Sequence, residues 1–505
     1  MPKAIPTTHR AAAVASDQLV EHPFDRDEEL TLHVRLHADP AQKAGMEEVL
    51  ADLASQLPHD RGHLSHDEIG ARFGATSAAL EPVAEALGKL GLKATGEDPT
   101  HRDLRVEAPL GVIEEALGID AMAVHRGGRV FRSFHGPIRL EHSLADRISD
   151  VRGLETVPSV MPRTHSTAPS DRHYAVREVA ELYDFPLESR GKGQTVVIVA
   201  LGGGFHRQDL ETYFGALDLK VPTVEVEGVN GAANRPASSA AVQGLLKAQQ
   251  MDPTLLPSQS AEDGVTDMVD AMWTVEVTSD IEVLGALVPE ARIVVLFAAN
   301  TPSDQIAALR RALSPEFEKL HGLPTVISCS WGQRESTLRE SSRQAFDDEL
   351  KHAAARGVTV CCASGDSGGG FVNYPASSPF AVGCGGTSLV RPRTENRRKT
   401  RLREEVWREV REGRFFSSSG GGFSSSFPVP AWQEAAIKKW SRGQRGVPDL
   451  AAQASLATGY SLVVGDARVG IGGTSVAAPL IAGLVSQIVE SNGGLAAGYR
   501  VGWLT

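Results

Sequence analysis

The chain has 505 residues, of which 41% are hydrophobic and 23% are charged, and its net charge is −12. This length exceeds what one hydrophobic core usually spans, so two domains are expected. The acidic balance disfavours nucleic acid as a main partner, no apolar run reaches the roughly 18 residues that cross a bilayer, and the first residues show no apolar stretch of a secretory signal peptide.

Residues 1–27 are expected to form a disordered tail, and residues 28–155 alternate short strand and helix patterns. ELTLHVRLHA has the two-residue period of a strand, and AQKAGMEEVLADLASQL is an amphipathic helix. Helices are also predicted at LSHDEIGARFG and TSAALEPVAEALGKLG, with Ser65 and Thr76 as N-caps. Two strands, a helix, a hairpin and a last helix near SLADRISDV follow. The pattern predicts a small α+β domain with helices on one face of an antiparallel sheet.

A linker rich in Pro, Ser, Thr and Arg is predicted at residues 156–172, and its composition suits proteolytic processing. From residue 173 to 505 near-continuous apolar strands alternate with long helices. The strands are QTVVIVAL, ARIVVLFAA, PTVISCSWG, GVTVCCASG and PFAVGCGG. This alternation predicts an α/β domain whose parallel sheet is covered by helices on both faces.

Two segments of the second domain are interpreted as insertions. Residues 228–265 are small and polar, and they predict a long surface loop. Residues 391–414 are dense in Arg with interleaved Glu, which favours a solvated arm over a nucleic-acid patch. The four cysteines stand in apolar or glycine-rich stretches without metal-ligand spacing and are interpreted as buried small side chains.

A candidate nucleophile stands in GIGGTSVAAPL, where Ser475 follows a Gly-Gly-Thr turn at the start of an apolar helix. A serine hydroxyl needs a positioned base, and that base is most often histidine. The histidines after the linker have no strand-end or glycine-flanked motif; they are His173, His206, His321 and His352. A Ser-His-Asp triad is therefore poorly supported.

Carboxylates offer another base. Glu276 and Asp280 are four residues apart on a predicted helix, so both side chains lie on one face. Two close carboxylates share a proton, which lets the pair accept the serine proton at acidic pH. This spacing is also common on exposed helix faces, but the apolar neighbours of the pair favour burial.

Asp366 is the third candidate carboxylate. It follows a buried strand in GVTVCCASGDSGGG, at the sheet edge where sites of open parallel sheets form. Kept protonated, it could donate a hydrogen bond to a developing oxyanion. The alternative is an aspartate that orders the turn through its own backbone.

These stretches, in this order, resemble the sedolisin family of serine-carboxyl peptidases, and most closely its kumamolisin-like members. The matching segments are LGGG (201–204), EVTSD (276–280), SCSWG (328–332), ASGDSG (363–368), SGGGFS (419–424), GVPDL (446–450) and GGTSVAAP (472–479). LSHDEIGARFGA resembles the activation propeptide of the same family. The resemblance covers residues 28–500 and implies a subtilisin-like α/β fold behind a removable, ferredoxin-like propeptide.

The resemblance also implies roles for individual residues. Ser475 would be the nucleophile, Glu276 the general base and Asp280 its orienting, proton-sharing partner, with Asp366 as the acid of the oxyanion hole. Trp331 would lie beside the carboxylate pair and wall the cleft. Extended peptide substrate would bind along backbone that includes Ser330, Gly332, Gly420, Gly421 and Gly422.

Two positions depart from the family pattern. Many relatives have a glutamate before Leu-Gly-Gly-Gly, where this chain has Ala200, and its absence should shift the pKa of the carboxylate pair. The family's calcium (Ca²⁺) loop, rich in oxygen ligands, is also not found in the stretch after Ser475, so no bound calcium is expected.

The predicted function is an acid serine endopeptidase that removes its own propeptide and acts through an acyl-enzyme. Its partners would be peptide substrates and its own propeptide as an intramolecular inhibitor; no nucleic acid or membrane is expected, and the protein would be an extracellular monomer. The alternative is a relative that binds peptides or a partner without efficient catalysis.

Overall fold

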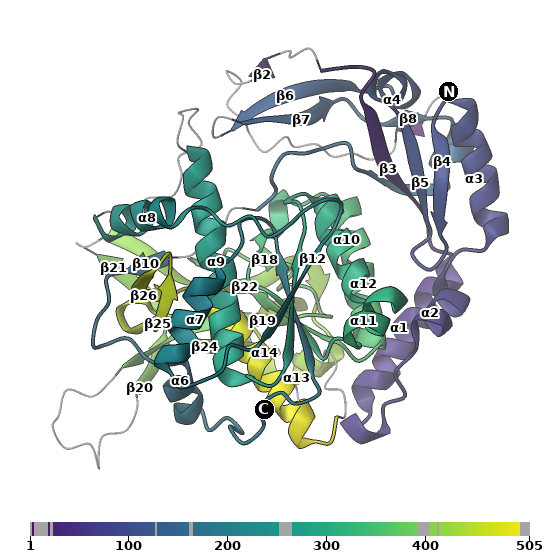
Figure 1. Ribbon diagram of the computed structural model, residues 1–505. Helices are drawn as coiled ribbons and strands as arrows, with labels where there is room; N and C mark the ends of the chain where they lie inside the picture. Colours follow the sequence, from purple (N-terminus) through teal and green to yellow (C-terminus); the bar gives the residue numbers. More distant parts are fainter. Residues whose placement is uncertain are drawn as a thin grey trace.

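The computed structural model describes residues 3–4, 19–20, 24–126, 129–160, 165–251, 265–390, 403–411 and 414–494. It contains a smaller N-terminal domain, purple and blue in Figure 1, that lies along one side of a larger domain coloured teal to yellow. This division agrees with the two domains expected from the chain length.

The N-terminal domain is built on an antiparallel sheet with the strand order β4-β5-β3-β9. These strands are Lys93–Asp98 (β4), Asp103–Pro109 (β5), Glu29–Leu36 (β3) and Ile148–Arg152 (β9). Helices α3 (Ser77–Lys89) and α4 (Leu110–Leu117) bury their apolar faces against it. The hairpin β6 (Asp120–Arg126) and β7 (Arg129–His135) confirms the predicted hairpin, although residues 127–128 of its turn lie outside the described residues.

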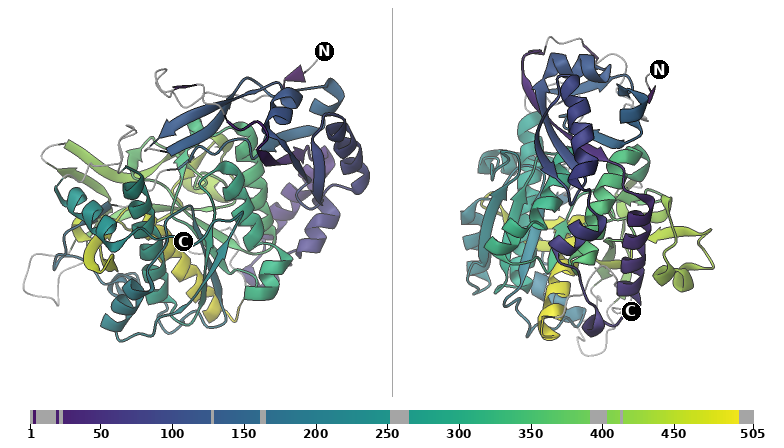
Figure 2. Two further views of the ribbon diagram at one scale, coloured as in Figure 1. Left: turned by 45° about the horizontal axis from the view of Figure 1, so that its top comes forward. Right: turned by 90° about the vertical axis from the view of Figure 1, so that its right-hand side faces the viewer.

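Two further helices extend from this domain along the larger one, α1 (Pro40–Ser55) and α2 (His66–Phe73). Both views of Figure 2 show them, in purple, beside the larger domain. Ser65 caps α2 in a capping box with Glu68, as its sequence predicts, because its Oγ accepts from Glu68 N and Glu68 Oε2 accepts from Ser65 N. Thr76 is the N-cap residue of α3, but its side chain makes no capping hydrogen bond.

The helix predicted near SLADRISDV is wrong in its second half. Only the four-residue helix α5 (His142–Ala145) forms, and the following residues make strand β9. Ile148 and Val151 pack into the domain core, and β9 pairs with β3. Tertiary pairing with a sheet edge thus outweighs the local helical pattern.

The larger domain is built on a sheet that has eight strands in the part of the chain that the structure describes. Their order is β12-β13-β11-β14-β16-β19-β20, with β24 beside β19. The strands are Thr223–Gly228 (β12), Arg292–Phe297 (β13), Thr195–Ala200 (β11), Val326–Cys329 (β14), Thr359–Ala363 (β16), Val382–Val390 (β19), Arg403–Val406 (β20) and Leu450–Gln453 (β24). The described pairings are parallel except for β19 with β20.

Helices cover both faces of this sheet. On one face lie α6 (Val176–Leu182), α7 (Arg207–Ala216), α8 (Ser239–Met251), α9 (Val265–Leu287) and α14 (Thr474–Ser491). On the other lie α10 (Pro302–Ala312), α11 (Pro315–His321) and α12 (Glu340–Ala355). In β11, Val196 and Ile198 contact the first group of helices, while Val197 and Val199 contact the second. Burial on both faces explains the continuous apolar strands and confirms the predicted fold class.

Smaller elements complete the two domains. They are the strands Lys3–Ala4 (β1), Leu19–Val20 (β2), Arg139–Leu140 (β8), His165–Thr167 (β10), Gln333–Arg334 (β15), Ser367–Gly369 (β17), Asn373–Tyr374 (β18), Arg408–Arg411 (β21), Arg414–Pro428 (β22), Gln444–Val447 (β23), Tyr460–Val464 (β25) and Ala467–Gly472 (β26), together with the helix Ala431–Ile437 (α13). β10, β26 and β25 form a three-stranded sheet that leads directly into α14.

The long loop predicted at residues 228–265 is corrected by helix α8. Val242, Leu245 and Leu246 are buried against the core, at the i, i+3, i+4 spacing of an amphipathic helix. Residues 252–264 lie outside the described residues, as do 391–402 and 412–413 of the predicted arm, whose remaining residues form β20 and β21.

Among the residues that the structure describes, α14 is long and apolar enough to cross a membrane by length and composition alone. Most of it is buried inside the larger domain, where it packs against α9 and the central strands. It is therefore the core helix of this domain. The four cysteines are buried and free, as the sequence predicts.

Candidate active site

Three neighbouring strands of the large sheet end at the same place. β11, β14 and β16 are adjacent and parallel, so their carboxyl ends meet at one edge of the sheet. The chain continues there into the glycines after Ala200, into Ser330 and Trp331, and into Asp366. In open parallel sheets this edge is where binding sites form.

Helix α9 brings the two candidate carboxylates to this edge. The hydroxyl of Ser330 donates to Asp280 Oδ1 at 2.6 Å, which ties the middle of α9 to the carboxyl end of β14. Glu276 lies one turn earlier on the same face of α9. Glu276 and Asp280 are each only 3% exposed, so they do not belong to a solvated helix face.

Helix α14 brings Ser475 to the same edge. Its first residue, Thr474, donates from its backbone N–H and from its hydroxyl to Asp366 Oδ1, at 2.9 and 2.7 Å. At the other end, Gln487 Nε2 donates to Leu287 O of α9 at 3.1 Å. Asp280 of α9 and Thr474 of α14 both lie at the carboxyl edge of the strands, and Gln487 meets the last residue of α9. The two helices therefore run in the same direction, from this edge to the opposite one.

The packing of α9 against α14 sets how far along each helix axis the candidate residues lie. A Cβ on Gly483 would lie 2.6 Å from Leu287 Cδ1, so the two helices approach closely there. Counted back from this contact, Ser475 is eight residues earlier on α14 and Asp280 is seven residues earlier on α9. At about 1.5 Å per residue, both lie roughly 10–12 Å from this contact, toward the N-termini of their helices. Ser475 and Asp280 therefore lie at one level.

The environment of Asp280 favours its protonated form. Burial raises the pKa of the Asp280 carboxyl well above its usual value, and the charge of Glu276 raises it further. The hydrogen bond from Ser330 opposes this shift without cancelling it. Asp280 therefore keeps its proton at a pH at which an exposed aspartate is ionised.

Asp366 is held by α14. Its Oδ1 accepts both hydrogen bonds from Thr474, and the Thr474 hydroxyl in turn accepts from Gly365 N–H at 3.0 Å. Its Oδ2 lies against Gly473, where a Cβ would be 2.8 Å away. The described hydrogen bonds of this carboxyl thus reach the start of the helix that carries Ser475. An aspartate that only ordered its own turn would not need them.

Ser475 is 5% exposed and lies in the first turn of α14, whose N-cap residue is Gly473. Backbone N–H groups in the first turn of a helix have no acceptor within the helix, and they mark its positive end. The start of α14 therefore offers backbone donors beside Asp366, where negative charge could develop.

The sequence missed two positioning residues. Ser330 is predicted only as substrate-binding backbone, yet its side chain contacts Asp280. Thr474 carries no predicted role, yet it holds Asp366. Both stand beside a predicted residue, in SCSWG and GGTS, but only the fold shows which carboxylate each contacts.

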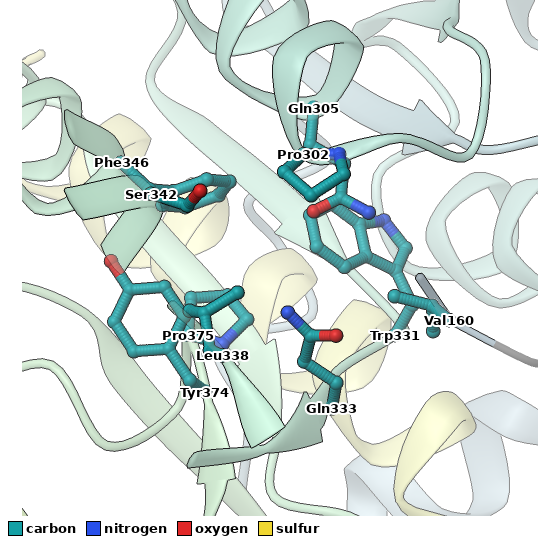
Figure 3. Close-up of a pocket in the computed structure, with 10 residues that line it drawn as sticks. All are labelled: Val160, Pro302, Gln305, Trp331, Gln333, Leu338, Ser342, Phe346, Tyr374 and Pro375. Atoms are coloured by element: carbon teal, nitrogen blue, oxygen red, sulfur yellow. The ribbon is translucent and has the colours of Figure 1, made fainter. Parts of the chain in front are cut away.

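Trp331 follows Ser330 and points to the other face of the sheet. Its indole N–H donates to Val199 O at 2.8 Å, and its ring packs edge-on against Phe346 of α12. It lines a small pocket with Val160 and Tyr374 (Figure 3). Trp331 thus walls a pocket on the side of α12, and its predicted place beside the carboxylate pair stays a prediction.

The predicted substrate-binding glycines pair within the protein. Gly420 N–H donates to Gly365 O at 2.5 Å, and Gly421 O accepts from Gly370 N–H at 2.8 Å. Gly422 pairs with Val447 of β23. Gly332 follows Trp331 at the end of β14.

The four histidines after the linker have contacts elsewhere. His173 contacts Thr167, and His206 Nε2 lies 2.7 Å from Ala237 O. His321 lies between two glutamates, and His352 is buried beside Glu349. None of these described contacts involves Ser475.

The calcium site of the family finds no ligand set in the described residues after Ser475. Calcium takes about 6 to 8 oxygen ligands. The acidic residue of this stretch, Glu490, accepts a hydrogen bond from Gly191 N–H at 2.6 Å. The residues described there do not fit the ion, and no chemical step is assigned to it.

The parallel sheet, the buried serine at the start of α14 and the carboxylates at the same edge define a subtilisin-like α/β domain with a serine-carboxylate site. Residues 278–498 match the Subtilase family, and residues 17–157 match the Pro-kumamolisin activation domain. Kumamolisin from Bacillus sp. (strain MN-32) is 33% identical over 467 residues, which are 87% of this chain and 77% of kumamolisin.

Two further proteins are similar to this chain over much of its length. Xanthomonalisin from Xanthomonas sp. (strain T-22) is 23% identical over 482 residues, covering 86% of this chain and 55% of its own. A solved structure of Pseudomonas sedolisin (serine-carboxyl proteinase), complexed with two molecules of pseudo-iodotyrostatin, has a TM-score of 0.50 and 21% identity over 66% of this chain and 85% of that one. The chain belongs to the sedolisin family of serine-carboxyl peptidases, in its kumamolisin-like branch, and its N-terminal domain is an activation propeptide.

Proposed function

We propose that this serine peptidase is an acid endopeptidase in which Ser475 is the nucleophile and Glu276 is its general base. Asp280 shares the proton of Glu276, and Asp366 is the acid of the oxyanion hole. The observation that carries the proposal is the buried pair Glu276 and Asp280 at the level of Ser475, with the pKa of Asp280 raised. A base of this kind works at a pH at which histidine is protonated.

The proposed reaction follows the arrangement of these groups. Ser475 Oγ attacks the scissile carbonyl while its proton passes to Glu276, and the oxyanion accepts hydrogen bonds from Asp366 and from backbone N–H at the start of α14. The proton then passes to the leaving amine, which leaves an acyl-enzyme. Water hydrolyses the acyl-enzyme by the same steps.

The propeptide linker supports self-processing. Val160 lines the pocket beside Trp331, and His165 pairs with Gly472, three residues before Ser475. The chain on both sides of residues 161–164 is thus held by the two elements that flank the candidate site. We infer that the propeptide inhibits the enzyme and that cleavage takes place in this linker.

The test is incubation of the full-length chain at pH 4, followed by N-terminal sequencing of the product. We expect loss of roughly the first 165 residues, and no loss in Ser475→Ala (the boundary follows the linker at residues 156–172). Identical maturation of Ser475→Ala without added protease would refute the nucleophile. An intact fold that never processes or cleaves denatured protein between about pH 3 and 5 would favour the binding-only alternative.

A further inference from the structure

A buried cluster of ligand atoms lies where the propeptide contacts the larger domain. His101 comes from the propeptide, while Glu349 and His352 come from α12. One ligand atom of each lies within 4.8 Å of the others, and the three residues are 5%, 0% and 5% exposed. The proposed reaction uses none of them.

The distances suit a tetrahedral metal ion. His101 Nε2 lies 3.2 Å from Glu349 Oε2, and His352 Nδ1 lies 3.7 Å from the same oxygen. Zinc–nitrogen and zinc–oxygen bonds of about 2.0–2.2 Å place neighbouring ligands of a tetrahedron about 3.3 Å apart. Glu349 and His352 are three residues apart on one helix, so both side chains lie on the same face.

The surroundings orient the ligands. His101 Nδ1 lies 2.7 Å from Asp98 Oδ2, which fixes the ring and directs Nε2 toward Glu349. A carboxylate behind a histidine is the usual outer partner of a metal-bound imidazole. Arg310 Nε donates to Glu349 Oε1 at 2.8 Å, whereas Oε2 is buried and faces the rings of His101 and His352.

The charges also favour a cation. Asp98 and Glu349 flank His101 with two carboxylates, and the guanidinium of Arg310 is shared between Glu349 and Asp103.

A route for the ion exists on both sides of the cluster. His101 and Asp98 line one open cavity between the domains, and His352 lines another. Ligands from two domains also mean that the site exists only while the propeptide is docked.

We propose that His101, Glu349 and His352 form a zinc site, completed by water, that joins the propeptide to α12 and stabilises the latent enzyme. Borderline N/O ligation of this kind favours zinc over calcium or magnesium.

The direct test uses the full-length Ser475→Ala protein, freed of metal with EDTA and titrated with zinc chloride at pH 7 in a calorimeter. We expect one zinc ion per chain with micromolar or tighter affinity. His101→Ala and His352→Ala should each weaken it by at least about tenfold, as should Asp98→Asn through the orientation of His101. His206→Ala, a histidine distant from the cluster, is the matched control and should bind like the parent.

A second measurement does not depend on the folding of the variants. Cobalt chloride added to the parent protein should give the intense visible absorption of tetrahedral coordination, and zinc should abolish it. Absence of both the heat and the spectrum, or unchanged binding in both alanine variants with circular dichroism intact, overturns the proposal. Because binding is read without catalysis, failure of the peptidase assignment leaves this test valid.

Discussion

Asp280 is the residue whose chemistry depends most on its surroundings. Its carboxyl is buried, receives a hydrogen bond from Ser330 and lies near a second carboxyl, so its pKa is raised. The folded protein therefore binds a proton that the unfolded chain releases above about pH 3.9. Between that pH and the raised pKa, stability falls as pH rises, because the folded state holds more protons.

Asp280→Asn should test this pH dependence of stability. The amide keeps an acceptor for Ser330 and imitates the neutral acid, so the variant should become more stable than its parent as pH rises from 4 to 7, by up to about 1.4 kcal/mol per pH unit. Thermal unfolding in the Ser475→Ala background measures this. Peptidase activity of the single variant should fall about 10²-fold or more. A stability difference that is independent of pH would show that Asp280 is ionised throughout.

Gly473 controls the position of Asp366. Its φ of +121° is open mainly to glycine, and a Cβ there would lie 2.8 Å from Asp366 Oδ2. Gly473→Ala should displace the carboxyl and lower kcat about 10²-fold, with a smaller change in KM. Gly493→Ala is the control, because Gly493 also has a positive φ but nothing within 4 Å of its Cβ. Equal activity of the two variants would exclude a role for Gly473 in positioning the acid.

At the scale of elements, the site depends on how α9 and α14 pack. The two helices supply the carboxylate pair and the serine, and their close approach at Gly483 sets their relative height. Close-packed helices tolerate little added volume at such a contact. The distance between Ser475 and Asp280 is therefore sensitive to a residue two turns away.

Gly483→Leu should reveal this dependence. The added side chain overlaps the buried Leu287 and should cost about 1–3 kcal/mol of unfolding free energy, with a loss of activity larger than stability explains. Leu287→Ala in the same chain should restore part of both. Gly244→Leu on α8, where nothing lies within 4 Å of the Cβ, is the matched control. Full activity of Gly483→Leu would show that the helices move apart without disturbing the site.

The elements also show what sequence can predict. Strands buried on both faces have apolar runs that identify them, and α9 has enough apolar neighbours around Glu276 to predict its burial. Helix α8 was missed because its apolar residues Val242, Leu245 and Leu246 stand within a longer stretch of small and polar residues. The contact of Ser330 with Asp280 joins residues 50 positions apart, so it depends on strand order, which local patterns do not specify.

At the scale of the whole molecule, the propeptide contacts the larger domain at α12, away from the candidate catalytic residues. Part of its hold is apolar: Met46, Leu50, Ile69 and Phe73 of α1 and α2 form a cluster with Ala354 at the end of α12. Leu64 N–H also donates to Ala355 O at 2.8 Å. Beside this cluster, Arg35 and Arg102 of the propeptide each pair with Asp348 of α12 at 2.8 Å, so α12 holds the propeptide through both apolar and charged contacts.

Leu50→Ala tests the apolar part of this contact. Leu50 is 1% exposed, and its truncation should weaken docking by about 1–3 kcal/mol, so that the full-length chain processes roughly tenfold faster at a given pH and begins to process at a higher pH. Product formation followed on gels from pH 3 to 7 measures both. Leu57→Ala is the matched control, because Leu57 is 62% exposed and should leave the pH profile unchanged. If both variants process like the parent while their circular dichroism is intact, docking depends on the charged contacts alone.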